Sequence, residues 1–185
     1  MKVSRYHPLL VTLHWLLAIL IVAALTVGFV LALTPNAEAG KIVVLRWHMA
    51  GGMLILALMI ARFIVRLCTA RPAEATTGYP LLDRIAPITH YGFYLLVLLM
   101  VGTGYATGIM AGLPDIVFGG SGAPLPASFA VYPTFVAHGY LAAVLAAFVV
   151  LHVLAALYHQ FVKKDGLFAR MGFGRRVVNP PVPAE

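Results

Sequence analysis

Charged side chains are scarce in this sequence of 185 residues. They make up 10% of the chain, whereas hydrophobic residues make up 62%; an ordinary soluble domain is about 25% charged. The long apolar stretches contain no Asp or Glu, because all six carboxylates fall in the predicted loops and tails. Proton-coupled pumps and transporters commonly use a carboxylate inside the membrane, so this absence argues against that class.

The chain also has a single cysteine, Cys68. One thiol excludes a disulfide framework, and it excludes a zinc ribbon or an iron–sulfur cluster built by this chain alone. It also excludes the paired-cysteine motif that attaches a c-type haem covalently. We therefore turn to other side chains as candidate ligands.

Four apolar stretches are long enough to cross a bilayer, which takes about 20 residues in a helix. Backbone groups in lipid must form their hydrogen bonds within the segment, so all four are predicted as helices. Short connections predict an all-α integral membrane four-helix bundle in one domain over residues 1–185. The first stretch is too long for a signal peptide, so we expect the mature protein to keep it. The predicted spans are residues 9–33, 42–67, 85–109 and 134–162, with residues 163–185 as a cytoplasmic tail.

The net charge of +7 follows the predicted topology. Lys and Arg precede the first span, cluster between the second and third, and follow the fourth, while the third loop has neither. The positive-inside rule therefore places both termini and the second loop in the cytoplasm. The basic clusters indicate orientation and attraction to anionic membrane lipid, and they do not indicate nucleic-acid binding.

Histidine is the ionisable residue that recurs inside the predicted spans. One or two such residues could be core histidines bonded to a backbone carbonyl, but this does not explain six that have no acidic residue in their spans. Neutral imidazole is a good metal ligand, and haem iron takes axial histidines. The six residues are His14, His48, His90, His138, His152 and His159.

The depths of four histidines match in two pairs. His138 and His152 are fourteen residues apart, which is almost four helical turns, so they share one helix face at about 21 Å axial separation. In the predicted topology His48 and His138 lie near the outer side, whereas His14 and His152 lie deeper toward the cytoplasm. The spacing therefore predicts two stacked bis-histidine iron sites, His48–His138 outside and His14–His152 inside.

Small residues accompany these histidines. A flat macrocycle needs a slot between helices, and small residues allow one. Gly28 lies on the first span, "MAGG" follows His48, and residues 139–147 after His138 contain one glycine and four alanines. This composition favours a macrocycle beside the proposed ligands.

Four further residues lie near the predicted cytoplasmic side, and each has alternative interpretations. His90 and His159 are a rival pair for the inner iron, contacts to a quinone head group or a haem propionate, or interfacial histidines that reach water. Arg62 and Arg66 are expected to snorkel to the cytoplasmic surface, with a propionate contact as the alternative.

On the outer side Lys41 and Arg46 are the only cations. They fit a haem propionate or another anion, or they form an ordinary solvated pair. The loop at residues 111–133 is rich in Gly and Pro, and it either folds back over the bundle end, docks a partner or has no chemical role. After the fourth span, residues 163–176 are predicted to lie along the membrane surface and residues 177–185 to form a loose tail.

Three stretches carry a resemblance to a known family. They are "RYHPLLVTLHWLLAILI", "LRWHMAGGMLILALMIARFIVRL" and "HGYLAAVLAAFVVLHVLAALYHQFVKKDGLFARM". With them the chain resembles the prokaryotic cytochrome b561 family, which is similar to the cytochrome b subunits of formate dehydrogenase and nickel–iron hydrogenase. The resemblance implies that His14, His48, His138 and His152 are the axial ligands of two non-covalent b haems.

The resemblance also implies a function in the bacterial inner membrane. Family members pass electrons across the membrane and exchange them with the quinone pool. Stand-alone members include a superoxide oxidase that reduces ubiquinone, and Lys41 and Arg46 would suit an anion such as superoxide. Other members anchor a dehydrogenase, hydrogenase or c-type cytochrome partner, and the sequence leaves this alternative open.

A competing hypothesis is a transporter or membrane protein that binds zinc or nickel through its histidines. The missing membrane carboxylates and the two separated levels of histidines disfavour it.

Overall fold

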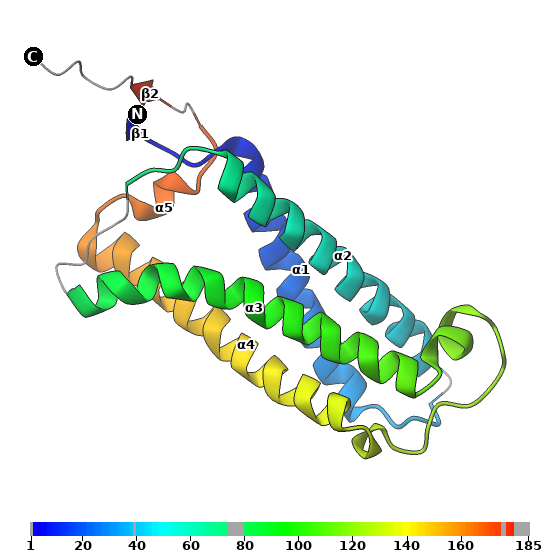
Figure 1. The fold of residues 1–185 in the computed structure, drawn as a ribbon. Helices are drawn as coiled ribbons and strands as arrows, with labels where there is room; N and C mark the ends of the chain where they lie inside the picture. Colours follow the sequence, from blue (N-terminus) through cyan, green and yellow to red (C-terminus); the bar gives the residue numbers. More distant parts are fainter. Residues whose placement is uncertain (1, 39, 74–79, 175–176, 180–185) are drawn as a thin grey trace, which may run out of the picture.

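Four long helices form the body of the protein. The computed structural model describes residues 2–38, 40–73, 80–174 and 177–179. The helices run up and down along an elongated bundle (Figure 1). Each contains a segment long and apolar enough to cross a membrane, which confirms the predicted all-α membrane bundle. Their bounds are α1 Pro8–Leu33, α2 Lys41–Cys68, α3 Pro80–Met110 and α4 Pro133–Tyr158.

Local chemistry sets the ends of α1. Pro8 occupies its first turn, and the Nδ1 atom of His7 accepts a hydrogen bond from the Leu9 amide. At the other end, the Lys41 ammonium donates to the Thr34 carbonyl at 2.5 Å and to the Asn36 side chain at 2.7 Å. A cation at the carboxyl end of a helix complements its dipole, so the first residue of α2 also stabilises the end of α1.

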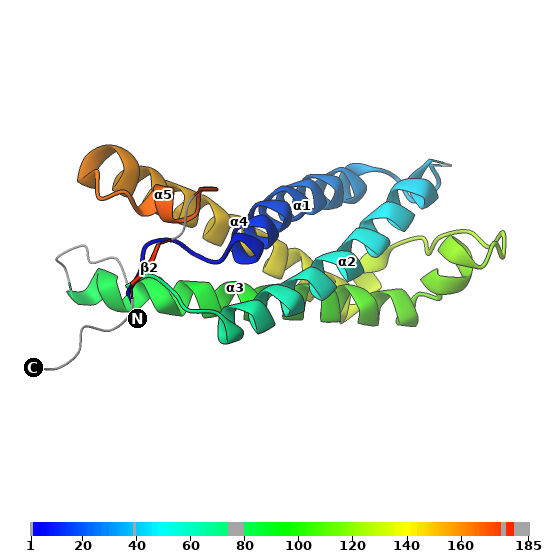
Figure 2. The same ribbon diagram turned by 90° about the horizontal axis from the view of Figure 1, so that it is seen from above.

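The helices pack in two close pairs, α1 with α2 and α3 with α4. Contacts between α2 and α3 join the two pairs. Among the described residues α4 makes few close backbone approaches to α1 or α2. Figure 2 shows α1 and α4 separating toward the end of the bundle where the third loop lies. Space between α4 and the α1–α2 pair is therefore left for side chains and for any bound group.

An apolar cluster fills the middle of the bundle with residues from all four helices. Leu145 on α4 is 4% exposed and lies seven residues from both His138 and His152. Large apolar side chains on the outer surface, such as Phe29 and Leu33, are exposed, as expected for a bundle surrounded by lipid. The cluster consists of Leu17, Ile21, Ile55, Met59, Val97 and Leu145.

The long third loop folds back over one end of the bundle. It contains a π-turn, η1 (Pro114–Phe118), and a 3-10 turn, η2 (Phe129–Val131). Val117 is fully buried, and its carbonyl accepts a hydrogen bond from the Arg46 guanidinium at 2.8 Å. The Asn36 amide donates to the Pro126 carbonyl at 2.6 Å. Of the interpretations open from sequence, the structure shows the folded-back loop.

The first and last described segments of the chain meet at the opposite end of the bundle (Figure 1). The two-residue strands β1 (Lys2–Val3) and β2 (Val178–Asn179) pair antiparallel. The short helix α5 (Leu167–Arg170) precedes β2, and the Met171 carbonyl after it accepts a hydrogen bond from the Trp15 indole at 2.9 Å.

The expectation of a loose tail from residue 177 was therefore wrong for residues 178 and 179, because they pair with the amino-terminal strand. Residues 175–176 and 180–185 lie outside the described residues. Two termini at one end fit four spans, and the cytoplasmic placement of that end stays a prediction.

Candidate functional site

His48 on α2 and His138 on α4 face each other near the end of the bundle covered by the third loop. Their ring centroids are 6.2 Å apart, and both side chains are partly buried. Two imidazoles that bind one metal ion from opposite sides, with metal–nitrogen bonds of about 2 Å, hold their ring centroids about 6 Å apart. The observed separation fits that arrangement.

A backbone hydrogen bond orients the His138 ring. Its Nδ1 atom lies 2.9 Å from the carbonyl oxygen of Met100 on α3 and 3.3 Å from the Thr103 hydroxyl. A carbonyl only accepts hydrogen bonds, so Nδ1 carries the proton and the neutral ring has its lone pair on Nε2. Metal-binding histidines commonly have such a partner, which fixes the tautomer and the ring orientation.

Two glycines on neighbouring helices leave room for these rings. A Cβ atom added at Gly104 on α3 would lie 3.0 Å from Cε1 of His138, and one added at Gly28 on α1 would lie 3.2 Å from Cε1 of His48. The sequence had singled out Gly28, but Gly104 was missed because nothing in the chain indicates which residue of α3 meets His138. Gly51, Gly52 and Gly139, close to the histidines in sequence, have open space around them instead.

We expect Gly104→Ala to disturb the site around His138. The new methyl group would press on the imidazole and shift it by a few tenths of an ångström from the Met100 carbonyl, because a contact of 3.0 Å is tighter than most real Cβ contacts. If the ring is a haem ligand, the absorption and electron paramagnetic resonance spectra of that haem should change and its occupancy should fall. Gly102→Ala is the matched control, because Gly102 has no neighbour within 4 Å. Equal spectra for both variants would contradict the close packing of His138.

The outer pair opens into a large apolar cavity of about 960 Å³ between the four helices. This volume lies near the upper limit of ordinary ligand pockets, which span about 300–1,000 Å³. The third loop lines its outer end through Leu113, Phe118 and Phe129. Nδ1 of His48 is buried here and has no hydrogen-bond partner among the described residues. A large, flat apolar group with a metal ion at its centre fits this chemistry.

The second group of histidines lies toward the end of the bundle where the termini meet. The ring centroids of His14 on α1 and His152 on α4 are 6.1 Å apart. His90 on α3 also lies with its centroid 6.1 Å from that of His152. Aromatic rings border the group, because Trp15 packs against His14 and Phe93 against His152. The structure thus brings His14 and His152 together and adds His90 as a second neighbour of His152.

Arg62 and Arg66 do not both reach the surface as expected. Arg66 is only 7% exposed, and its guanidinium lies 5.8 Å from the centre of the Tyr91 ring. Arg62 donates a hydrogen bond to the Tyr94 hydroxyl at 2.5 Å. The snorkelling prediction was wrong for Arg66, because tyrosines of α3 hold the arginines against the bundle.

His159 has an acidic partner that sequence analysis did not foresee. It opens the π-turn η3 (His159–Lys163), and its Nδ1 atom lies 2.6 Å from the Asp165 carboxylate. Asp165 lies just beyond the span and therefore escaped a search of the apolar stretches. Partial desolvation opposes its ionisation, but hydrogen bonds from His159 and the Leu167 amide hold the pKa of Asp165 below its usual value. His159 is thus buried beside Asp165, whereas the ring near His152 is that of His90.

Lys41 and Arg46 are both engaged in backbone contacts. Lys41 is 6% exposed and lines the outer cavity, where it binds the end of α1. Arg46 holds the third loop through Val117 and is exposed. The solvated-pair interpretation was wrong for Lys41, because its ammonium group is buried among oxygen acceptors.

Four helices long and apolar enough to span a membrane, with histidine rings together at two depths, define a polytopic helical membrane protein with candidate ligand pairs in its interior. Residues 5–174 match the family model described as prokaryotic cytochrome b561, and the chain belongs to that family. Membership makes it a haem b electron-transfer protein of the bacterial inner membrane.

Two curated relatives are similar over most of their length. A probable superoxide oxidase CybB of Yersinia pestis is 29% identical over 173 residues, which cover 91% of this chain and 96% of the relative. The cytochrome b561 homolog 2 of Escherichia coli K12 is 25% identical over 171 residues, which cover 91% of each chain.

Proposed function

We propose that this protein holds two non-covalent b haems and moves electrons between a donor on the outer, periplasmic side and the quinone pool. His48 and His138 would be the axial ligands of the outer haem, and His14 and His152 those of the inner haem. The observation that carries the proposal is the pair of facing imidazoles at each of two depths, with ring separations of 6.2 and 6.1 Å.

The chain's own residues provide orientation and a dry path for this function. The Met100 carbonyl holds His138 with Nε2 free to bind a metal ion. The folded-back third loop lines the outer end of the cavity with apolar side chains. Between the two levels stands the apolar cluster around Leu145, which excludes ions from the space that electrons must cross. Two b haems would supply the one-electron chemistry, and two histidine ligands leave the iron no open position.

Superoxide is the electron donor that the similarity to the Yersinia pestis relative favours. Two superoxide anions would each lose one electron and leave as dioxygen, and one quinone would gain both electrons and two protons. Attraction of an anion would fall to Arg46 rather than Lys41, since the exposed Arg46 keeps guanidinium nitrogens beyond the one bonded to Val117.

Turnover by the isolated chain tests this function. Detergent-solubilised protein would be mixed with superoxide and ubiquinone. The haem absorption spectrum and the ubiquinone concentration would be recorded at the same time. We expect reduction of the haems followed by loss of one ubiquinone for two superoxide anions. If ubiquinone reduction requires a co-purifying soluble subunit, the chain is instead a haem-bearing membrane anchor for a dehydrogenase, hydrogenase or c-type cytochrome.

We place the quinone head group near His159, where Asp165 orients the imidazole. Asp165→Asn should leave haem content unchanged and slow quinone reduction by up to roughly 100-fold, the lower end of what a positioned proton donor contributes. Asp115→Asn is the control, because Asp115 is an exposed carboxylate in the third loop at the opposite end. A steady-state assay with varied quinone checks this, and equal rates for both variants would remove His159 from the quinone site.

A further inference from the structure

On α2, an arginine lies at the position that corresponds, by its distance from the outer histidine, to the inner histidine of α4. Arg62 follows His48 by fourteen residues, the same interval that separates His138 from His152. Fourteen residues are almost four helical turns, so Arg62 shares the face of His48 and lies about 21 Å further along the helix axis. The guanidinium is close enough to His14 and His152 to interact electrostatically with both rings. Arg62 therefore lies at the inner histidine pair.

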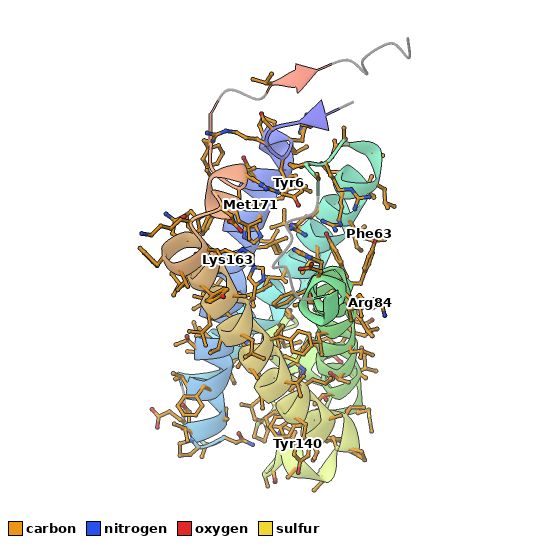
Figure 3. The ribbon with its side chains drawn as sticks, turned by 90° about the vertical axis from the view of Figure 1, so that its left-hand side faces the viewer. Tyr6, Phe63, Arg84, Tyr140, Lys163 and Met171 are labelled. Carbon is orange, nitrogen blue, oxygen red and sulfur yellow. The ribbon has the colours of Figure 1, made fainter. Side chains whose placement is uncertain are left out.

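Arg66 lies one turn beyond Arg62, and both arginines are held by tyrosines of α3. The Tyr94 hydroxyl accepts a hydrogen bond from Arg62, and the Tyr91 ring lies beside the Arg66 guanidinium. Arg66 is more than nine-tenths buried. Figure 3 shows Phe63, the neighbour of Arg62 on α2, toward the end of the bundle where Met171 lies, and Tyr140 at the opposite end.

The two guanidinium groups have donors without acceptors. The Nε atoms of Arg62 and Arg66 are buried and have no hydrogen-bond partner within the described part of the chain. No ion pair joins either arginine to a carboxylate among the described residues. A buried cation without a counter-charge is costly, so such groups are normally paired with an anion. The described residues thus supply no anion for this pair, and an anion from outside the chain would satisfy both guanidinium groups.

We propose that Arg62 and Arg66 bind the propionate carboxylates of the inner haem. This inference rests on the proposed function, because it takes the haem held by His14 and His152 as its ligand. A planar guanidinium binds a carboxylate through two parallel hydrogen bonds, which makes arginine suited to this group. The arginines would fix the haem with its propionates toward the end of the bundle where the chain termini meet.

The observations favour a propionate over a lipid phosphate. A small apolar groove of about 240 Å³ lies between α2 and α3, lined by residues such as Phe63, Tyr94 and Leu98. Neither arginine lines this groove. The charge of Arg62 acts on the rings of His14 and His152. The interaction of Arg62 with these two rings therefore favours the propionate of a haem held between them.

The arrangement has a redox consequence. Reduction adds one negative charge to the haem, and a buried cation beside it stabilises the reduced form. Arg62 and Arg66 therefore raise the reduction potential of the inner haem. A higher potential there favours electron flow from the outer side toward the quinone.

The test compares Arg62→Gln and Arg66→Gln with Arg84→Gln in the full-length haem-loaded protein. Arg84 is an exposed arginine of α3, so its variant removes one positive charge without touching the site. The inner haem is the one missing from His14→Ala, and its potential is measured by redox titration of the absorption spectrum. We expect a lower inner-haem potential in Arg62→Gln and Arg66→Gln, and an unchanged one in Arg84→Gln. Arg62→Lys should restore much of the potential, because it keeps the charge.

A second measurement uses haem dimethyl ester, in which both propionates lack charge. Wild-type protein depleted of haem should bind haem at the inner site about 10–100-fold more tightly than the ester, as expected for an outer-shell contact. The Arg62→Gln/Arg66→Gln double variant should bind both forms equally well. An unchanged preference for haem, with an unchanged potential, would overturn the proposal.

Two other outcomes are distinguishable. If the wild-type protein holds fewer than two haems, the proposed function itself fails. If the double variant keeps both haems at their original potentials but loses a phospholipid that the wild-type protein retains in mass spectrometry, the site binds lipid phosphate and the propionate assignment is overturned.

Discussion

Replacing His138 or His152 by alanine should remove one haem and leave the other. Each imidazole would supply one of two axial bonds to a separate iron, so its loss should open that site alone. His48→Ala should deplete the same haem as His138→Ala, and His14→Ala the same haem as His152→Ala. Pyridine haemochromogen assays on purified protein give the stoichiometry, and reduced-minus-oxidised spectra identify which haem remains.

His90→Ala is the sharpest control for this prediction. Its ring lies as far from His152 as that of His14 does, with both centroid separations at 6.1 Å. We expect His90→Ala to keep both haems, whereas His14→Ala loses the inner one. The reverse result would make His90 the inner ligand and would move the inner haem between α3 and α4.

The second large effect is on electron transfer across the membrane. His152→Ala should abolish quinone reduction, because the inner haem that receives electrons from the outer haem would be missing. Rapid mixing with superoxide should still reduce the outer haem in this variant, and the reduced form should then persist in the presence of ubiquinone. His159→Ala is the contrasting variant, since it should keep both haems and slow only the quinone step. Reoxidation of the outer haem at the wild-type rate in His152→Ala would show a quinone site on the outer side.

The histidine positions could be predicted because helix geometry alone determines them. Fourteen residues between His138 and His152 place both on one face of α4, and the alternating direction of the spans matches their depths to those of His48 and His14. The structure brings these rings together in those combinations. Their roles as haem ligands stay predictions.

The position of α3 could not be predicted, because the rotation of one apolar helix against another depends on side-chain packing. Met100 and Gly104 meet His138 only because α3 packs closely along α4. The same packing brings His90 beside His152. From the sequence alone, this contact could not be distinguished from a pair of His90 with His159.

Contacts between residues far apart in sequence were also missed. The Arg46 bond to Val117 depends on the path of a glycine- and proline-rich loop, and the pairing of β1 with β2 depends on both chain ends meeting. The His159–Asp165 contact is local, but it depends on the π-turn η3 and the left-handed conformation of Lys164 that follows it. A regular α-helix through this segment would carry the two side chains onto different faces.

The most direct test of two haems held at two depths is the visible spectrum of the His138→Ala/His152→Ala double variant. This protein lacks both proposed ligands on α4 and keeps the other histidines. If α4 supplies one ligand to each haem, the purified variant should elute as folded protein and show no b-type absorption after reduction with dithionite. Full absorption at the wild-type stoichiometry would contradict both sites.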